Sequence, residues 1–217
     1  MLAPTPPMGW MSWQVFRCGT TCTGPYADDC IGEKLYRSTA DAIVKGGFLK
    51  AGYDGVHIDD CWEQLSRDAQ GRLMANSSRF PSGIGGPQGL AAYLHARNLR
   101  LGIYSDEGTN TCGGFPGSEG TEALDAQTFA DWGVDYLKFD GCNEPTSGYP
   151  AGYTAMARAL ERSGRNIVYS CSWPAYLGDD ERRKPYAAIS KAGCTLWRNW
   201  HDIQCSWDSL SSIIDHW

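Results

Sequence analysis

Carboxylates at the ends of short apolar runs are the residues of this chain best suited to chemistry. Asp140 lies near the end of residues 136–142, which read Tyr-Leu-Lys-Phe-Asp-Gly-Cys. Residues two apart in a strand share a face, so Lys138 and Asp140 are expected on one side. A neighbouring ammonium favours the ionised carboxylate, the form that a nucleophile needs. The alternative is a structural ion pair, but the carboxyl end of a strand favours a catalytic role.

Two further polar clusters follow other apolar runs. Asp59 and Asp60 repel each other, so they need a metal, a cation or hydroxyl donors, and a sugar supplies hydroxyls; Asp60 could instead cap a helix. In the segment 197–202, Arg198 can hold a hydroxyl or orient a carboxylate, and Asp202 could donate a proton. A loop ion pair is the simpler interpretation of this cluster. No spaced metal-binding set is formed by the histidines, His57, His95, His201 and His216.

Strand-like and helix-like segments alternate along the chain. The predicted strands are 8–13, 55–59, 99–104, 134–139, 167–172 and 195–199, and the predicted helices are 33–46, 88–97, 125–132, 152–163 and 186–192. This alternation predicts a parallel sheet, either doubly wound or a partial (β/α)8 barrel. Polar side chains stand near the ends of nearly all strands, and no glycine-rich phosphate loop follows the first one. We therefore expect a TIM barrel of about six β/α units.

Composition narrows the class of protein. The 217 residues are 42% hydrophobic and 20% charged, which is typical of a soluble globular domain with one core. A net charge of -6 argues against a nucleic-acid partner, and no apolar run is long enough for a membrane span. The nine Trp and eleven Tyr could stack on sugars or simply pack a core. No signal-peptide apolar region follows Met1.

The cysteines indicate an oxidising compartment. Nine are present, none with zinc-ribbon spacing, and eight could form four disulfides in any of 105 pairings. Asn76 begins an Asn-Ser-Ser acceptor sequence for N-glycosylation, which agrees with a secretory route.

Motifs across the chain resemble glycoside hydrolase family 27, the α-galactosidases and α-N-acetylgalactosaminidases, and especially the lysosomal enzymes of animals. Among the matching stretches are Pro7-Met-Gly-Trp-Met-Ser-Trp13, Ile58-Asp-Asp-Cys-Trp62, Leu101-Gly-Ile-Tyr-Ser-Asp106 and Lys138-Phe-Asp-Gly-Cys142. Residues 79–81, 112–117, 125–133, 169–174 and 197–199 also match, in the order of the family.

The resemblance implies a retaining double displacement without a metal or organic cofactor. Asp140 matches the family nucleophile and Asp202 its acid/base, and such carboxylates lie about 5 to 5.5 Å apart in retaining enzymes. The residues that match the lining of the sugar pocket are Trp13, Asp59, Asp60, Tyr104, Lys138, Tyr176 and Arg198. The implied disulfides are Cys18–Cys61, Cys22–Cys30, Cys112–Cys142 and Cys171–Cys194, which leaves Cys205 unpaired.

This sequence departs from the family pattern in two respects. Family members continue for two more strands and an antiparallel β-domain, so residues 1–217 are expected to form an incomplete catalytic barrel without that domain. Open strand edges then favour self-association, with a homodimer as one form. Ser172 and Ala175 match the branch that cleaves N-acetylgalactosamine, whereas strict α-galactosidases carry Glu and Leu there. The expected activity is therefore removal of terminal α-linked N-acetylgalactosamine, with weaker activity on galactose.

Three alternatives remain open at this stage: a strict α-galactosidase, a sugar-binding remnant without turnover, and a metal-dependent barrel of the enolase kind. The last needs carboxylate ligands on three successive strands, and the third predicted strand ends at Tyr104, with Asp106 close behind. A glycan or glycolipid is the expected partner, and a lysosomal or secreted location is expected.

Overall fold

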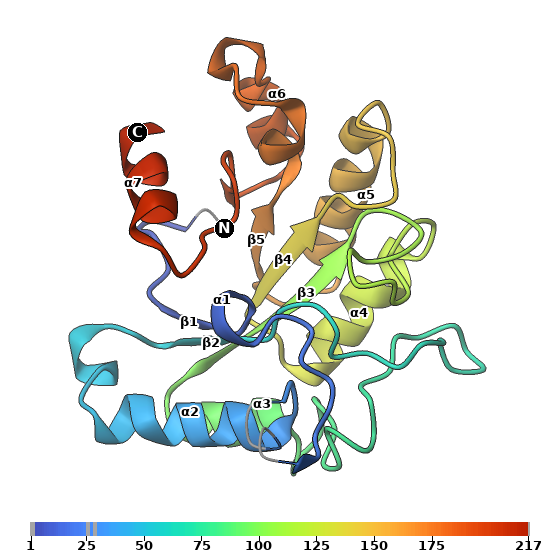
Figure 1. Ribbon diagram of the computed structural model, residues 1–217. Helices are drawn as coiled ribbons and strands as arrows, with labels where there is room; N and C mark the ends of the chain where they lie inside the picture. Colours follow the sequence, from blue (N-terminus) through green and yellow to red (C-terminus); the bar gives the residue numbers. More distant parts are fainter. Residues whose placement is uncertain (1–2, 25–26, 28–29, 217) are drawn as a thin grey trace.

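The computed structural model describes residues 3–24, 27 and 30–216. Its centre is one sheet of six parallel strands in sequence order. The sheet curves around the open side of the molecule (Figure 1). The strands are β1 (Gly9–Met11), β2 (Gly55–His57), β3 (Arg100–Asp106), β4 (Tyr136–Asp140), β5 (Val168–Cys171) and β6 (Leu196–Trp197).

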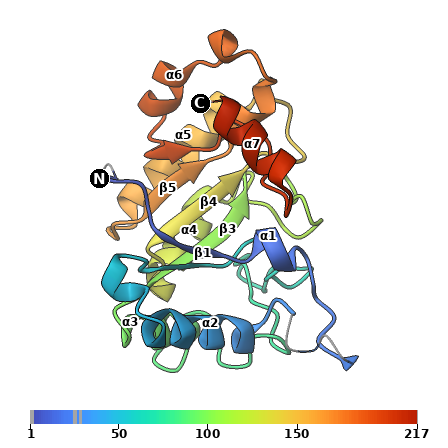
Figure 2. The same ribbon diagram turned by 60° about the vertical axis from the view of Figure 1, so that its left-hand side comes forward.

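A helix follows every strand, as a series of β/α units requires. These helices are α2 (Glu33–Lys45), α3 (Leu90–His95), α4 (Glu122–Trp132), α5 (Tyr149–Arg162), α6 (Tyr186–Lys191) and α7 (Trp207–His216). Shorter segments are the helix α1 (Trp13–Phe16) and the 3-10 turns η2 (Leu49–Ala51), η3 (Trp173–Leu177) and η4 (Glu181–Arg183). Figure 2 shows α2 and α3 together on the outer side of the sheet. The arrangement is a half-barrel of the (β/α)8 type, so the predicted fold class is confirmed.

Alternation along the central strands separates the core from the site. Leu137 and Phe139 on β4 are fully buried in a hydrophobic cluster with residues of the outer helices. Lys138 and Asp140 point to the opposite face, the inside of the barrel. The registers of β3 and β4 pair Tyr104 with Lys138. The apolar residues thus hold the strands against the helices, while the polar residues between them meet inside the barrel.

His57 fills the barrel interior below the polar residues. Its ring occupies the space beside Gly55 and Gly102, where a Cβ would overlap the imidazole. The ring packs edge-on against Tyr136 with centroids 4.4 Å apart. Burial lowers the pKa of His57 to about 4, so the imidazole is neutral near pH 7. We interpret His57 as a packing residue.

Several predicted boundaries were wrong. The first strand ends at Met11, and Trp13 begins α1 instead of ending a strand. The chain turns there after the Ser12 backbone N–H donates to the His57 carbonyl oxygen. β3 continues to Asp106, two residues beyond the predicted end at Tyr104. The helix α7 was not predicted, although Trp207, Leu210 and Ile214 follow a helical spacing.

Four disulfides brace the loops, and they join the pairs that the family resemblance implies. They are Cys18–Cys61, Cys22–Cys30, Cys112–Cys142 and Cys171–Cys194, with Cα separations of 5.2 to 5.8 Å. Cys205 is exposed and carries a free thiol. Within residues 3–24, 27 and 30–216, no helix has the length and apolar character that crossing a membrane requires.

Candidate active site

Asp140, the last residue of β4, lies at the centre of a cluster of polar side chains at the carboxyl ends of the strands, which we call the polar cluster. Its Oδ1 accepts a hydrogen bond from the Tyr176 hydroxyl at 2.7 Å, and its Oδ2 accepts one from the Tyr104 hydroxyl at 3.1 Å. Arg198 Nη2 lies 3.5 Å from Oδ1. Burial alone raises the pKa of this carboxyl, but the charges of Lys138 and Arg198 and the hydrogen bond from Tyr176 outweigh it and lower the pKa. Asp140 is thus an ionised carboxylate held among donors.

Lys138 lies on the same face as Asp140, but its direct partner is different from the expected one. Its ammonium binds Asp59 Oδ2 at 2.7 Å, across the sheet from β4 to the end of β2. Both side chains are largely buried, at 13% and 1% exposure. Lys138 therefore neutralises Asp59 by contact and affects Asp140 only through space. The alternation of residues within β4 could not predict this ion pair, because Asp59 follows another strand.

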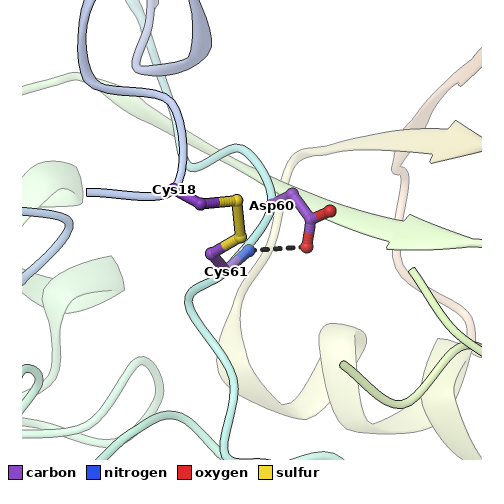
Figure 3. Close-up of side chains that lie close together, drawn as sticks. All are labelled: Cys18, Asp60 and Cys61. Carbon is purple, nitrogen blue, oxygen red and sulfur yellow. Dashed lines mark hydrogen bonds between the residues drawn. A yellow bond between two sulfur atoms is a disulfide. The ribbon is translucent and has the colours of Figure 1, made fainter. Parts of the chain in front are cut away.

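Asp60 is held beside a disulfide. Figure 3 shows Asp60 next to the Cys18–Cys61 bridge, with its carboxylate accepting a hydrogen bond from the Cys61 backbone N–H at 2.6 Å. The Gly113 N–H donates to its other oxygen at 2.7 Å. Cys61 itself has a φ of 72°, a left-handed conformation that is uncommon outside glycine. The loop after β2 is thus locked by the bridge and by Asp60, which is not a helix cap.

Asp106 belongs to the same polar cluster, although it is not among the predicted site residues. It is fully buried at the end of β3 and accepts backbone N–H bonds from Gly108 at 2.9 Å and Cys142 at 3.1 Å. Burial raises its pKa to about 8, and the charge of Asp140 adds to this effect. The signal that could have found it is its position two residues after Tyr104, on the same face of one strand.

Arg198 and Asp202 follow β6 and belong to the same cluster. Asp202 Oδ1 lies 3.6 Å from Arg198 Nε, and the Asp202 side chain is 40% exposed. The same guanidinium therefore contacts both Asp140 and Asp202. A carboxylate among donors and a second, more accessible carboxylate thus face one cation at the carboxyl ends of the strands.

The other predicted pocket residues lie around the carboxylates Asp140 and Asp202. Ser172 follows β5 and is buried, and its hydroxyl lowers the pKa of Asp140. Ala175 and Tyr176 follow in η3, where Ala175 is half-buried. Trp13 lies near Lys138, whose Nζ is 5.9 Å from the centre of its ring. The structure thus brings together residues from the ends of all six strands.

Carboxylates do stand at the ends of three successive strands, because β3 reaches Asp106. Their oxygens, however, already have partners: Asp59 binds Lys138, and Asp106 accepts two backbone N–H groups. Among the described residues, the two groups with metal-ligand spacing each include two disulfide-bonded cysteines, which offer no thiolates. These contacts do not favour the enolase-like alternative.

A half-barrel that gathers carboxylates, tyrosines and a guanidinium at the carboxyl ends of its strands is the architecture of barrel enzymes. The family model described as alpha galactosidase A, Melibiase_2, matches residues 5–217. The chain belongs to this family, glycoside hydrolase family 27.

Known relatives are similar over nearly all of this chain. Identity is 50% with an alpha-N-acetylgalactosaminidase of Gallus gallus, over 99% of this chain and 52% of the relative. It is 49% with alpha-galactosidase A of Homo sapiens, over 99% of this chain and 49% of the relative. A solved structure of an alpha-galactosidase from Saccharomyces cerevisiae with raffinose superposes with a TM-score of 0.75 and 33% identity, over 93% of this chain and 41% of that one. The chain spans about half the length of the curated relatives it matches.

Proposed function

We propose that this chain is the barrel part of a retaining exo-glycosidase that removes terminal α-linked N-acetylgalactosamine, and galactose more slowly, from glycans or glycolipids. The observation that carries the proposal is the shared guanidinium: Arg198 lies 3.5 Å from Asp140 and 3.6 Å from Asp202. Two carboxylates on either side of a sugar are what glycoside hydrolysis needs.

The environments of the two carboxylates suit different roles. Asp140 has a lowered pKa and accepts bonds from two tyrosine hydroxyls, so it serves as the nucleophile at the anomeric carbon. Asp202 is more exposed and gives its proton to the leaving oxygen. In the second step Asp202 takes a proton from water, the water oxygen bonds to the anomeric carbon, and the bond to Asp140 breaks.

The preference for N-acetylgalactosamine rests on two small side chains. Ala175 leaves room for the acetamido methyl group, and the Ser172 hydroxyl is the donor proposed for its carbonyl oxygen. In the structure the same hydroxyl lowers the pKa of Asp140. Overall identity does not decide the substrate, since an N-acetylgalactosaminidase and an α-galactosidase are matched at 50% and 49%.

The test is turnover of aryl α-N-acetylgalactosaminide and aryl α-galactoside by this 217-residue chain. NMR of the first sugar released should show the α anomer, as retention requires. Asp140→Asn should abolish turnover. Release of the β anomer would contradict the retaining mechanism, and binding without turnover would favour the sugar-binding alternative.

Location and association are further parts of the proposal. Four disulfides agree with a secreted or lysosomal protein. The edges of β1 and β6 each have a strand neighbour on one side only in the described sheet, and Trp207 on α7 is 71% exposed. These surfaces favour self-association, with a homodimer as the simplest form. Sedimentation over a range of concentrations tests it.

A further inference from the structure

The segment that carries Asp202 is held by a polar network centred on Glu181, in the turn η4. Glu181 Oε1 lies 2.5 Å from Lys184 Nζ and 3.0 Å from His216 Nε2. Its Oε2 accepts a hydrogen bond from the Tyr186 hydroxyl. Lys184 is fully buried in its side chain. A buried ammonium needs an anion nearby, and Glu181 supplies it.

The three partners of Glu181 each contact a residue between Arg198 and Asp202. Lys184 donates to the carbonyl oxygen of Asn199. The Asn199 side-chain amide donates to the Tyr186 hydroxyl at 3.2 Å. The ring of His216 stacks on Trp200, with centroids 3.8 Å apart and planes at 17°.

The segment that carries Asp202 has no helix or strand of its own, so these side-chain contacts hold it in place. β6 ends at Trp197 and α7 begins at Trp207, so Asp202 stands in an irregular segment. Figure 2 shows α7 beside this segment on the open side of the half-barrel, near the chain that leads into α6. Arg198 Nη1 also donates to the Trp200 carbonyl oxygen at 3.0 Å, so fixing Trp200 fixes Arg198.

We propose that Glu181 is a positioning residue for the acid/base: through Lys184, Tyr186 and His216 it fixes Asn199 and Trp200, and so sets where Arg198 and Asp202 stand. The inference rests on the proposed function for its catalytic consequence, but its structural part is independent of turnover. Displacement of a catalytic group by about 1 Å costs on the order of 100-fold in rate. Loss of this anchor should therefore impair acid catalysis before it impairs the fold.

The test compares Glu181→Gln with Asp180→Asn in the 217-residue chain. Asp180 is the adjacent carboxylate, it contacts Arg182, and Asn caps a helix as well as Asp does. Aryl glycosides with good leaving groups need little proton donation, whereas those with poor leaving groups need it fully. Glu181→Gln should lower kcat/KM, which reports the step in which Asp202 donates its proton, about tenfold more on the poor leaving group than on the good one. Asp180→Asn should lower neither. Equal losses of kcat/KM on both substrates would overturn the proposal.

Limited proteolysis gives a readout that does not need activity. Chymotrypsin cleavage after Trp200 should become faster in Glu181→Gln, relative to cleavage after the exposed Trp207. Tyr186→Phe removes one hydroxyl from the network and should give a smaller change in the same direction, even if Glu181→Gln fails to fold. Unchanged cleavage after Trp200 in the folded variants would overturn the proposal, whereas a wild-type chain without turnover would overturn only the proposed function.

Discussion

Glu107, directly after β3, should make the stability of the fold depend on pH in a way that one substitution isolates. The residue is 4% exposed, and its Oε2 has no hydrogen-bond partner among the residues that the structure describes. Burial, followed by the charges of Glu144, Glu119 and Glu122, raises its pKa from 4.5 to about 7. The carboxyl is therefore protonated when folded over a range of pH where the unfolded chain has lost the proton.

The size and sign of the effect follow from these two pKa values. Well below pH 4.5 both the folded and the unfolded state hold the proton, so Glu107 does not lower the free energy of unfolding by ionising. As the pH rises towards about 7, the unfolded state loses the proton first, and the free energy of unfolding falls. The full loss is about 3 kcal/mol, because each pKa unit corresponds to about 1.4 kcal/mol. Above the folded-state pKa the loss is complete.

Urea unfolding of the wild type and Glu107→Gln, at intervals from about pH 4 to about pH 8, measures this loss. The neutral amide does not titrate, so the variant should gain about 3 kcal/mol relative to the wild type across the range. A buried amide without a partner shifts the variant's whole curve by about 1 to 3 kcal/mol without changing its slope. Glu161→Gln, on the exposed face of α5, is the control and should leave the slope unchanged. Parallel curves for the wild type and Glu107→Gln would show that the Glu107 pKa is not raised in the folded state.

Other predictions concern the site and a surface loop. Tyr176→Phe removes the donor 2.7 Å from Asp140, so the Asp140 pKa should rise and the acidic limb of kcat/KM should move to higher pH; a fixed limb contradicts this. Ser172→Glu with Ala175→Leu should move the kcat/KM ratio towards α-galactosides by on the order of tenfold, and an unchanged ratio means that these residues do not set specificity. Asn76, half-buried beside exposed serines, should carry a glycan after secretion from eukaryotic cells. Mass spectrometry should show that glycan lost in Asn76→Gln, and an unmodified Asn76 in the secreted protein contradicts the assignment.

The sequence pattern was sufficient for the sheet because period and spacing are local properties. Leu137 and Phe139 alternate with Lys138 and Asp140, and this alone predicts which side chains meet inside the barrel. The structure adds the partners across strands. The bond between Lys138 and Asp59 joins β4 to β2, and no local pattern specifies which of two neighbouring carboxylates the ammonium reaches.

The contacts that local sequence patterns do not predict lie mostly in loops. Asp106 became a buried acid because the loop closed by Cys112–Cys142 brings the Cys142 N–H to it. The Glu181 network depends on contacts between η4 and α7, which are 35 residues apart at Glu181 and His216. Such contacts follow from tertiary packing, and the periodicity of the sequence does not predict them.

Covalent trapping can show directly whether Asp140 is the nucleophile. A fluorinated α-glycosyl fluoride of the preferred sugar forms a slow glycosyl–enzyme intermediate in a retaining enzyme. After digestion, mass spectrometry should place the sugar on the peptide that contains Asp140, and Asp140→Asn should not be labelled. A label on any other residue, or steady turnover of unmodified substrates with no intermediate at Asp140, would show that Asp140 is not the nucleophile.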